Sequence, residues 1–284
     1  MIDRRPDYLT LVVSRPLEKN LTIHSEDEDG MVAKTTLMTL DVVGHEFFQA
    51  IGVGSSVSQP FITSNKKFYV ADNKTIYWLP YFEKAEVQFK GKFFLQPDWK
   101  VKLQKAISFL LERKHSFSVS RIDVSFKFQY DGKFEEELLF KSQFGKLRVR
   151  PELHEGKWGR VFAGNSRCQI SGYNKTVQMK DVKEDRDDEY IKLFLGVIGL
   201  TEMPKEPIYH LDLRLTPKSR ETEITELFNK TELDFTAIEE SVFKEIRKRL
   251  YFPKKIRELL GFTSWRNPFK KGTKKRKPKR RAKK

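Results

Sequence analysis

The chain has 284 residues, 38% of them hydrophobic, a formal net charge of +16 at pH 7 and one cysteine. This composition is sufficient for one large globular domain or two small ones. It excludes an intramolecular disulfide and a thiolate metal cluster, because each needs more than one cysteine. No apolar run approaches the length of a membrane-crossing segment, and no signal-peptide pattern opens the sequence, so we expect a protein of the cytoplasm.

The positive charge is concentrated at the C-terminus. Residues 270–284 hold eleven Lys or Arg and no acid, which leaves a net charge of +5 for the first 269 residues. A segment of this composition cannot bury apolar area, so we expect residues 266–284 to form a disordered basic tail. Its expected partner is a polyanion, most simply nucleic acid, held without sequence preference.

The first half of the chain is rich in strand signals. A strand is expected from Asp7 to Val13, and further strands at 68–71, 75–79 and 85–89. Trp78, within the strand expected at 75–79, and Tyr81 and Phe82, just after it, could stack on unpaired bases or could belong to the core. Apolar residues at helical spacing then predict a helix over residues 98–114.

The next strand, over residues 118–128, alternates polar and apolar side chains. Its polar face presents Arg121, Asp123, Ser125 and Lys127, because successive side chains of a strand point to opposite faces. A carboxylate flanked by cations is a candidate site group. A solvated edge face is the ordinary alternative.

Residues 159–176 predict a hairpin with a tight turn at Gly164-Asn165. Its second strand leads into Tyr173 and Lys175, which the alternation of a strand places on one face. A phenol beside an ammonium group is a candidate nucleophile, since the cation stabilises the phenolate and attracts a phosphate. Packing is the alternative role of such a tyrosine.

A third amphipathic strand is expected over residues 208–215. His210, Asp212 and Arg214 share its polar face, and an imidazole and a carboxylate two residues apart can reach one cation. If the three strands are neighbours in one sheet, their polar faces form one site with a tyrosine nucleophile, two carboxylates for a divalent cation, and cations for phosphate oxygens. That inventory suits phosphoryl transfer through a phosphotyrosine.

The order of these motifs resembles the Rep_trans family, the replication initiation factors of rolling-circle plasmids and related mobile elements. The shared features are Arg-x-Asp in a strand, Gly-Asn-Ser-Arg ahead of Tyr-Asn-Lys, and a strand reading Leu-Asp-Leu-Arg-Leu. The opening Asp7-Tyr8-Leu9-Thr10 is also similar to that family's first strand. The match spans roughly residues 7 to 220.

The resemblance implies a nicking and joining enzyme whose nucleophile, Tyr173, takes the 5′-phosphate of nicked origin DNA. Arg121, Lys175 and Arg214 would bind phosphate or hold the carboxylates. The resemblance also implies origin DNA as partner, single-stranded at the nick with duplex or hairpin nearby, and a host helicase. The enzyme would work in the cytoplasm of a bacterial cell that carries the plasmid or mobile element. The resemblance leaves open whether the protein forms a homodimer.

The resemblance further implies Asp123 and Asp212 as carboxylate ligands of Mg²⁺ or Mn²⁺. The family usually shows Glu at the position of Asp212. The shorter side chain would draw the metal back, and His210 would compensate as a ligand.

We therefore expect an α+β fold, with a mainly antiparallel β-sheet core and flanking helices. Residues 1–220 would form the catalytic domain, residues 221–265 a helical appendage packed on it, and residues 266–284 the tail. The expected function is initiation of rolling-circle DNA replication. A conjugative relaxase and a noncatalytic nucleic-acid-binding protein are the alternatives.

Overall fold

The computed structural model describes residues 2–14, 40–53, 69–71, 75–80, 84–154, 157–181, 188–217 and 223–269. Tyr81, Phe82 and the part of the predicted tail beyond residue 269 lie outside these ranges.

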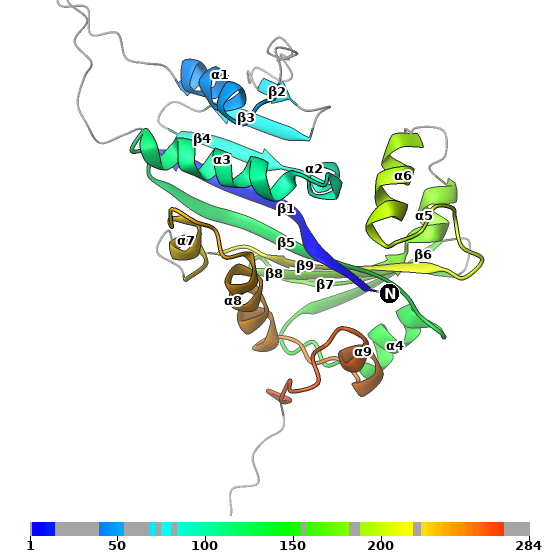
Figure 1. Cartoon of the computed structure of the whole chain (residues 1–284). Coiled ribbons are helices and arrows are strands. Elements are labelled where there is room, and N and C mark those ends of the chain that lie inside the picture. The colour runs from blue at the N-terminus through cyan, green and yellow to red at the C-terminus, as the bar shows by residue number, and fades with distance from the viewer. Residues whose placement is uncertain are drawn as a thin grey trace, which may run out of the picture.

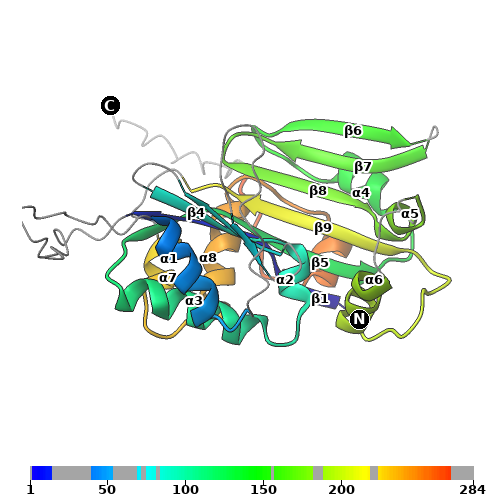
Figure 2. The same cartoon turned by 90° about the horizontal axis from the view of Figure 1, so that it is seen from above.

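One antiparallel sheet forms the body of the fold, and the described residues contribute nine strands to it in the order β2-β3-β4-β1-β5-β9-β8-β7-β6. This confirms the expected α+β class. The three strands with predicted site residues, β5, β9 and β8, are adjacent (Figure 2). The strands are β1 (Ile2–Ser14), β2 (Tyr69–Ala71), β3 (Ile76–Pro80), β4 (Lys84–Phe89), β5 (Phe117–Gln129), β6 (Arg148–His154), β7 (Lys157–Gly164), β8 (Cys168–Asn174) and β9 (Ile208–Leu215).

Helices lie on both sides of the sheet, but unequally. Figure 1 shows α4, α8 and α9 on one side of its β5–β9 region and α5 and α6 on the other, while α1 and α3 run along the half formed by β3, β4 and β1. The helices are α1 (Leu40–Ala50), α2 (Gly91–Leu95), α3 (Trp99–Glu112), α4 (Phe134–Lys141), α5 (Lys175–Asp181), α6 (Asp188–Val197), α7 (Glu223–Phe228), α8 (Phe235–Arg247) and α9 (Lys254–Leu259).

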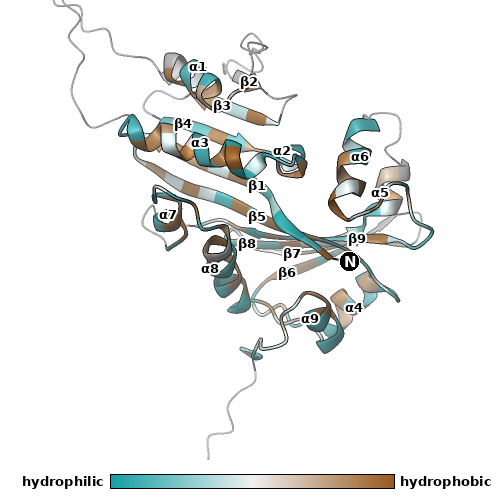
Figure 3. Cartoon of the chain, viewed as in Figure 1, coloured by the Kyte–Doolittle hydropathy of each residue, from teal (hydrophilic) through white to brown (hydrophobic). Residues whose placement is uncertain are grey.

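The alternation of β5 decides which face of the sheet is core. The apolar side chains of its second half are each at most 1% exposed, and they belong to one hydrophobic cluster with residues of α1, α3, α4, α7, α8 and α9. Hydrophilic and hydrophobic bands alternate along this strand in Figure 3. The opposite, polar face of β5 therefore faces away from the main core. The apolar set is Ile122, Val124, Phe126 and Phe128.

A second, smaller cluster closes one end of the polar face. Buried residues of α5 and α6 pack there on Ile208, the first residue of β9, and on Leu95 at the end of α2. An ion pair of 2.8 Å between Lys92 and Glu189 also joins α2 to α6. The helices α5 and α6 thus cover the strand ends near Tyr173, while the rest of the polar face does not belong to either cluster.

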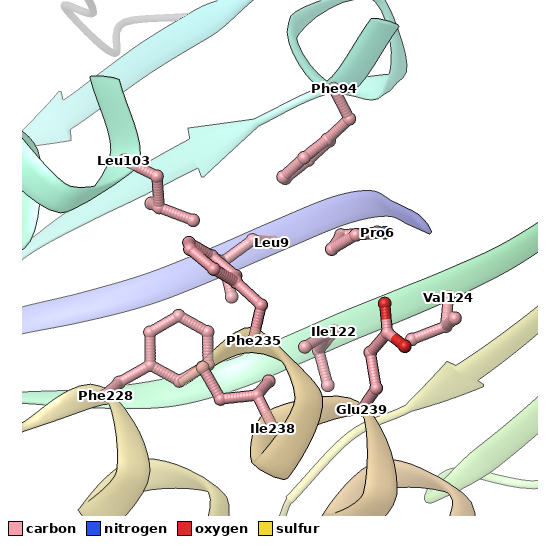
Figure 4. A pocket seen from close by; sticks show the side chains of 10 residues that line it. All are labelled: Pro6, Leu9, Phe94, Leu103, Ile122, Val124, Phe228, Phe235, Ile238 and Glu239. Carbon is pink, nitrogen blue, oxygen red and sulfur yellow. The ribbon is translucent and has the colours of Figure 1, made fainter. Parts of the chain in front are cut away.

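The core contains a cavity of about 10 Å³ between β1, β5, α2, α3, α7 and α8 (Figure 4). Its lining is apolar except for Glu239, whose carboxylate pairs with Arg4 at 2.7 Å. A void of this size is at the lower limit for one water molecule, so we interpret it as a packing gap. The lining is Pro6, Leu9, Phe94, Leu103, Ile122, Val124, Phe228, Phe235, Ile238 and Glu239.

Several details differ from the sequence-based expectations. The stretch from 130 to 158, for which no element was predicted, contains α4 and β6. Trp78 does not stack on bases from the surface: its side chain is 0% exposed and its ring lies 5.2 Å from that of Phe47. Within the described residues, no helix combines the length and apolarity that crossing a bilayer requires.

Glu135 in the first turn of α4 makes stability depend on pH. Burial raises the pKa of this carboxyl from 4.5 to about 7, although backbone hydrogen bonds at Glu135 and Asn174 work against the rise. The folded protein thus binds this proton more tightly than the unfolded chain, and it loses stability as the pH rises from 4.5 to 7.

We therefore expect Glu135→Gln to raise the melting temperature by a few degrees at pH 8 and to leave it unchanged at pH 4, below the range in which the loss occurs. Calorimetry at both pH values measures this. Glu136→Gln is the control, because Glu136 is in an ion pair with Lys133 and should give no gain at pH 8. An equal shift at both pH values in Glu135→Gln would contradict the prediction.

Candidate active site

The pairing of β5, β9 and β8 brings the predicted polar faces together. Ser125 pairs with Asp212, which pairs with Ser171, and the next row along contains His210 opposite Tyr173. Paired residues of antiparallel strands project on the same face about 4.5–5.5 Å apart. His210, Asp212 and Tyr173 therefore lie together because of register, not through a long loop.

Tyr173 contacts His210 directly. The phenol oxygen lies 3.0 Å from Nδ1 of His210, and the two rings are 5.2 Å apart. The other ring nitrogen, Nε2, lies 2.8 Å from Oδ1 of Asp212. The imidazole thus connects the hydroxyl to a carboxylate, and His210 itself is 3% exposed.

A third group, Asp7 of β1, completes the cluster. One ligand atom each of Asp7, His210 and Asp212 lies within 4.8 Å of the others. Asp7 occupies an irregularity of β1, because Pro6 pairs with Val124 and Tyr8 already pairs with Asp123. Such a bulge re-aims a side chain. It turns Asp7 towards β9 although β5 lies between the two strands.

The cluster has the features of a cation site. Nε2 of His210 and Oδ1 of Asp212 are buried, and apart from their mutual contact at 2.8 Å neither has a hydrogen-bond partner. Buried polar atoms are normally paired. Two carboxylates and an imidazole that converge in this way fit a divalent ion, and the donor set suits Mn²⁺ as well as any of the oxygen-preferring ions.

The electrostatics keep Asp212 charged and Tyr173 neutral. Burial favours the neutral acid, yet His210 and the ammonium groups of Lys127 and Lys175 hold the pKa of Asp212 below its ordinary value. Burial, with the carboxylates of Asp212 and Asp7, raises the pKa of Tyr173. The nucleophile candidate is thus a phenol at neutral pH in the absence of a cation.

Asp123 lies elsewhere on the polar face. Its carboxylate accepts hydrogen bonds from Nε and Nη2 of Arg121 and from Nε of Arg214, and it is 4% exposed. Arg121 also lies over the ring of Tyr8 at 3.7 Å. The predicted metal ligand Asp123 is therefore held by two arginines, which we call the arginine clamp, and Asp7 is the carboxylate that lies beside His210 and Asp212.

Lys175 lies near Tyr173, as expected, although it begins α5 and does not extend β8. Its ammonium nitrogen is 5.7 Å from the Tyr173 ring and donates to Gln178. Arg160 of β7 approaches the same ring at 5.7 Å and pairs with Tyr173 across the hairpin. Neither Arg160 nor Asp7 was expected, but the turn at Gly164-Asn165 sets a register that would have placed Arg160.

A comparison of the sequence with protein-family profiles gave no match, and a search of curated proteins also gave none. Among solved structures, the chain is similar to a rolling circle replication initiator protein from Geobacillus stearothermophilus. The TM-score is 0.50 at 13% sequence identity, over 89% of this chain and 87% of that chain. The two proteins share a fold.

The arginine clamp on Asp123 gives a prediction about stability. Arg214→Gln should lower the free energy of unfolding by about 1.5–3 kcal/mol, because a buried carboxylate loses a charged hydrogen bond. Urea unfolding measures the change. Arg113→Gln is the control: its ion pair with Glu46 is exposed, so a loss below about 1 kcal/mol is expected. Equal losses in the two variants would show that the clamp is unimportant.

Proposed function

We propose that this protein is a metal-dependent DNA nicking and joining enzyme that initiates rolling-circle replication. The observation that carries the proposal is the approach of the Tyr173 hydroxyl to His210, beside the cluster of Asp7, His210 and Asp212. A nucleophile next to a cation site is the arrangement needed for transfer of a DNA phosphoryl group to tyrosine. The fold shared with a rolling circle replication initiator protein supports it.

In the proposed reaction, the phenol oxygen of Tyr173 attacks the scissile phosphorus. A bond from tyrosine to the 5′-phosphate forms while the bond from phosphorus to the 3′-oxygen breaks. The phenol proton is released to water, and the departing 3′-oxygen takes up a proton to leave as a hydroxyl. Attack by that hydroxyl on the phosphotyrosine reverses the step and rejoins the strand.

The chain's own residues position the reactants. His210 holds the phenol oxygen at 3.0 Å, and Arg160 and Lys175 flank its ring with positive charge. Asp7, Asp212 and His210 would hold the divalent ion, Mg²⁺ or Mn²⁺. When bound, the ion would offset the two carboxylates, draw in a phosphate oxygen and stabilise the charge that develops there.

Formation of a covalent adduct tests the proposal. Single-stranded oligonucleotides that contain the origin are mixed with the protein and Mn²⁺, and the adduct is resolved on a denaturing gel. We expect a metal-dependent adduct with wild-type protein and none with Tyr173→Phe. Tyr209→Phe is the control, because Tyr209 is 5% exposed and its hydroxyl donates to Gly132.

An adduct that persists in Tyr173→Phe would move the nucleophile elsewhere and contradict the proposal. Binding of the oligonucleotide without an adduct, at any metal concentration, would instead favour a noncatalytic DNA-binding protein.

Gly91, at the start of α2, gives a separate test of the cation site. A Cβ atom at this position would lie 3.2 Å from Oδ1 of Asp7, so Gly91→Ala should displace that carboxylate. We expect Gly91→Ala to weaken Mn²⁺ binding roughly tenfold in the absence of DNA, because disturbing the surroundings of a metal ligand typically lowers metal affinity by that order. Asp7→Asn should weaken it further.

Isothermal titration with Mn²⁺ measures both variants. Gly196→Ala is the matched control, because a Cβ there meets no atom within 4 Å. Asp123→Asn is the second control and should bind Mn²⁺ like wild type. If Asp123→Asn lost Mn²⁺ binding while Gly91→Ala and Asp7→Asn kept it, the metal would be placed at Asp123.

A further inference from the structure

The polar face continues past Tyr173 onto β7 and β6, at the edge of the sheet. Arg160 pairs with Tyr173, Phe162 pairs with Ser171 of β8 and Arg150 of β6, and Arg148 pairs with Gly164. Paired residues share a face, so three arginines and one phenylalanine extend the face that carries the candidate site. We call Arg148, Arg150, Arg160 and Phe162 the ribbon face.

The positive charge of the ribbon face is largely uncompensated. Arg148, Arg150 and Arg160 are all exposed. Arg160 has Glu152 at 4.0 Å, and within the described part of the chain neither Arg148 nor Arg150 is in an ion pair. An uncompensated row of arginines on one face of a sheet is the electrostatic footprint of a polyanion.

Phe162 is a large apolar side chain on the polar face of the sheet, outside the core. The neighbouring Val161 and Ala163 point to the apolar side and are at most 1% exposed, whereas Phe162 is half-buried on the polar side. Its ring rests on the backbone of its own strand: a Cβ atom on Gly164 would lie 3.1 Å from Cζ of Phe162. The register places Phe162 opposite Arg150, on the face that also carries Arg148 and Arg160.

Arg160 links the ribbon face to the nucleophile. Its guanidinium lies 5.7 Å from the Tyr173 ring, and its Nε donates to Oγ of Ser171 at 2.6 Å. Neighbouring strands are about 4.8 Å apart, so β6 lies roughly 10 Å from β8. A DNA strand with one phosphate at Tyr173 can thus place its neighbouring nucleotides at Phe162 and Arg150.

We propose that the ribbon face holds the single strand of DNA next to the cleaved phosphate, with a base stacked on Phe162 and phosphates on Arg148 and Arg150. The inference deepens the proposed function and rests on it for the identity of the strand. Unpaired bases, rather than duplex, fit this surface because an aromatic ring can stack on a base only when the base has left its own stack.

The test is the affinity for a fluorescent oligo-dT of about 12 nucleotides, a length within the site sizes of such proteins. Fluorescence anisotropy is measured on the full chain in EDTA, so that no cleavage occurs, and with unlabelled duplex DNA present to occupy the basic tail. Phe162→Ala should weaken binding roughly five- to a hundredfold, and Phe162→Leu should weaken it nearly as much, because leucine preserves packing but not stacking.

The arginines are tested by salt dependence. Arg148→Gln combined with Arg150→Gln should reduce the slope of log affinity against log salt by about 1.4, since each phosphate contact to a single strand contributes about 0.7. Phe140→Ala and the pair Lys133→Gln with Lys141→Gln are matched controls. These exposed residues lie on α4 or, for Lys133, directly before it. Because α4 packs on the opposite face of β8, the variants should leave affinity and slope unchanged.

Wild-type affinity in both Phe162 variants, or an unchanged slope in the double arginine variant, would overturn the inference. Adduct formation at Tyr173 in the same proteins separates the two proposals. If variants of the ribbon face bind single strands and form the adduct like wild type, the ribbon-face proposal is wrong and the nicking proposal stands. If these variants lose single-strand binding and even the wild-type protein forms no adduct, the ribbon-face proposal is supported and the nicking proposal is wrong.

Discussion

A single row of side chains runs across six adjacent strands, and the candidate site depends on its register. Antiparallel pairing sets these residues opposite one another on the polar face, one from each of β1, β5, β9, β8, β7 and β6. A slip of one residue in any strand would turn its whole polar set into the core. The row is Asp3, Lys127, His210, Tyr173, Arg160 and Glu152.

Charge along this row is balanced by neighbours, which allows ionisable groups to be buried. Lys127 is 1% exposed, donates to Ser125 and has Asp3 at 3.5 Å. Its charge helps to keep Asp212 ionised. Farther along β5, Arg121 and Arg214 lower the pKa of Asp123 in the same way, although burial leaves that pKa above its ordinary value. The polar face is thus a scaffold of paired charges, and we place the cation where Nε2 of His210 and Oδ1 of Asp212 have only each other as partners.

The sequence predicted the strands of the site well because strand alternation is a local signal. The polar faces of β5, β8 and β9 followed from period-two patterns, and the structure puts the three strands side by side. The order of strands in the sheet is a tertiary property, and no local pattern contains it. Arg160 could have been placed from the hairpin register, since the turn between β7 and β8 fixes which residues pair.

Asp7 could not have been predicted in this way. Its side chain reaches the cluster through a bulge in β1, which depends on pairing with a strand more than 100 residues away in sequence. The sequence analysis named Arg121 and Arg214 as residues that could hold a carboxylate, but the contact of Arg214 with Asp123 comes from a different strand and depends on the order of strands in the sheet. For Asp123 the pattern gave the correct face but not the contact with Arg214, and for Asp7 it gave only the strand.

The central claim is that one sheet face assembles a cation site beside a tyrosine. Crystals soaked in Mn²⁺ test it most directly, by anomalous diffraction at the manganese edge. The account predicts a peak at coordination distance, about 2.0–2.3 Å, from atoms of Asp7, His210 and Asp212. A peak at Asp123 instead, or a well-occupied manganese far from Tyr173, would contradict it.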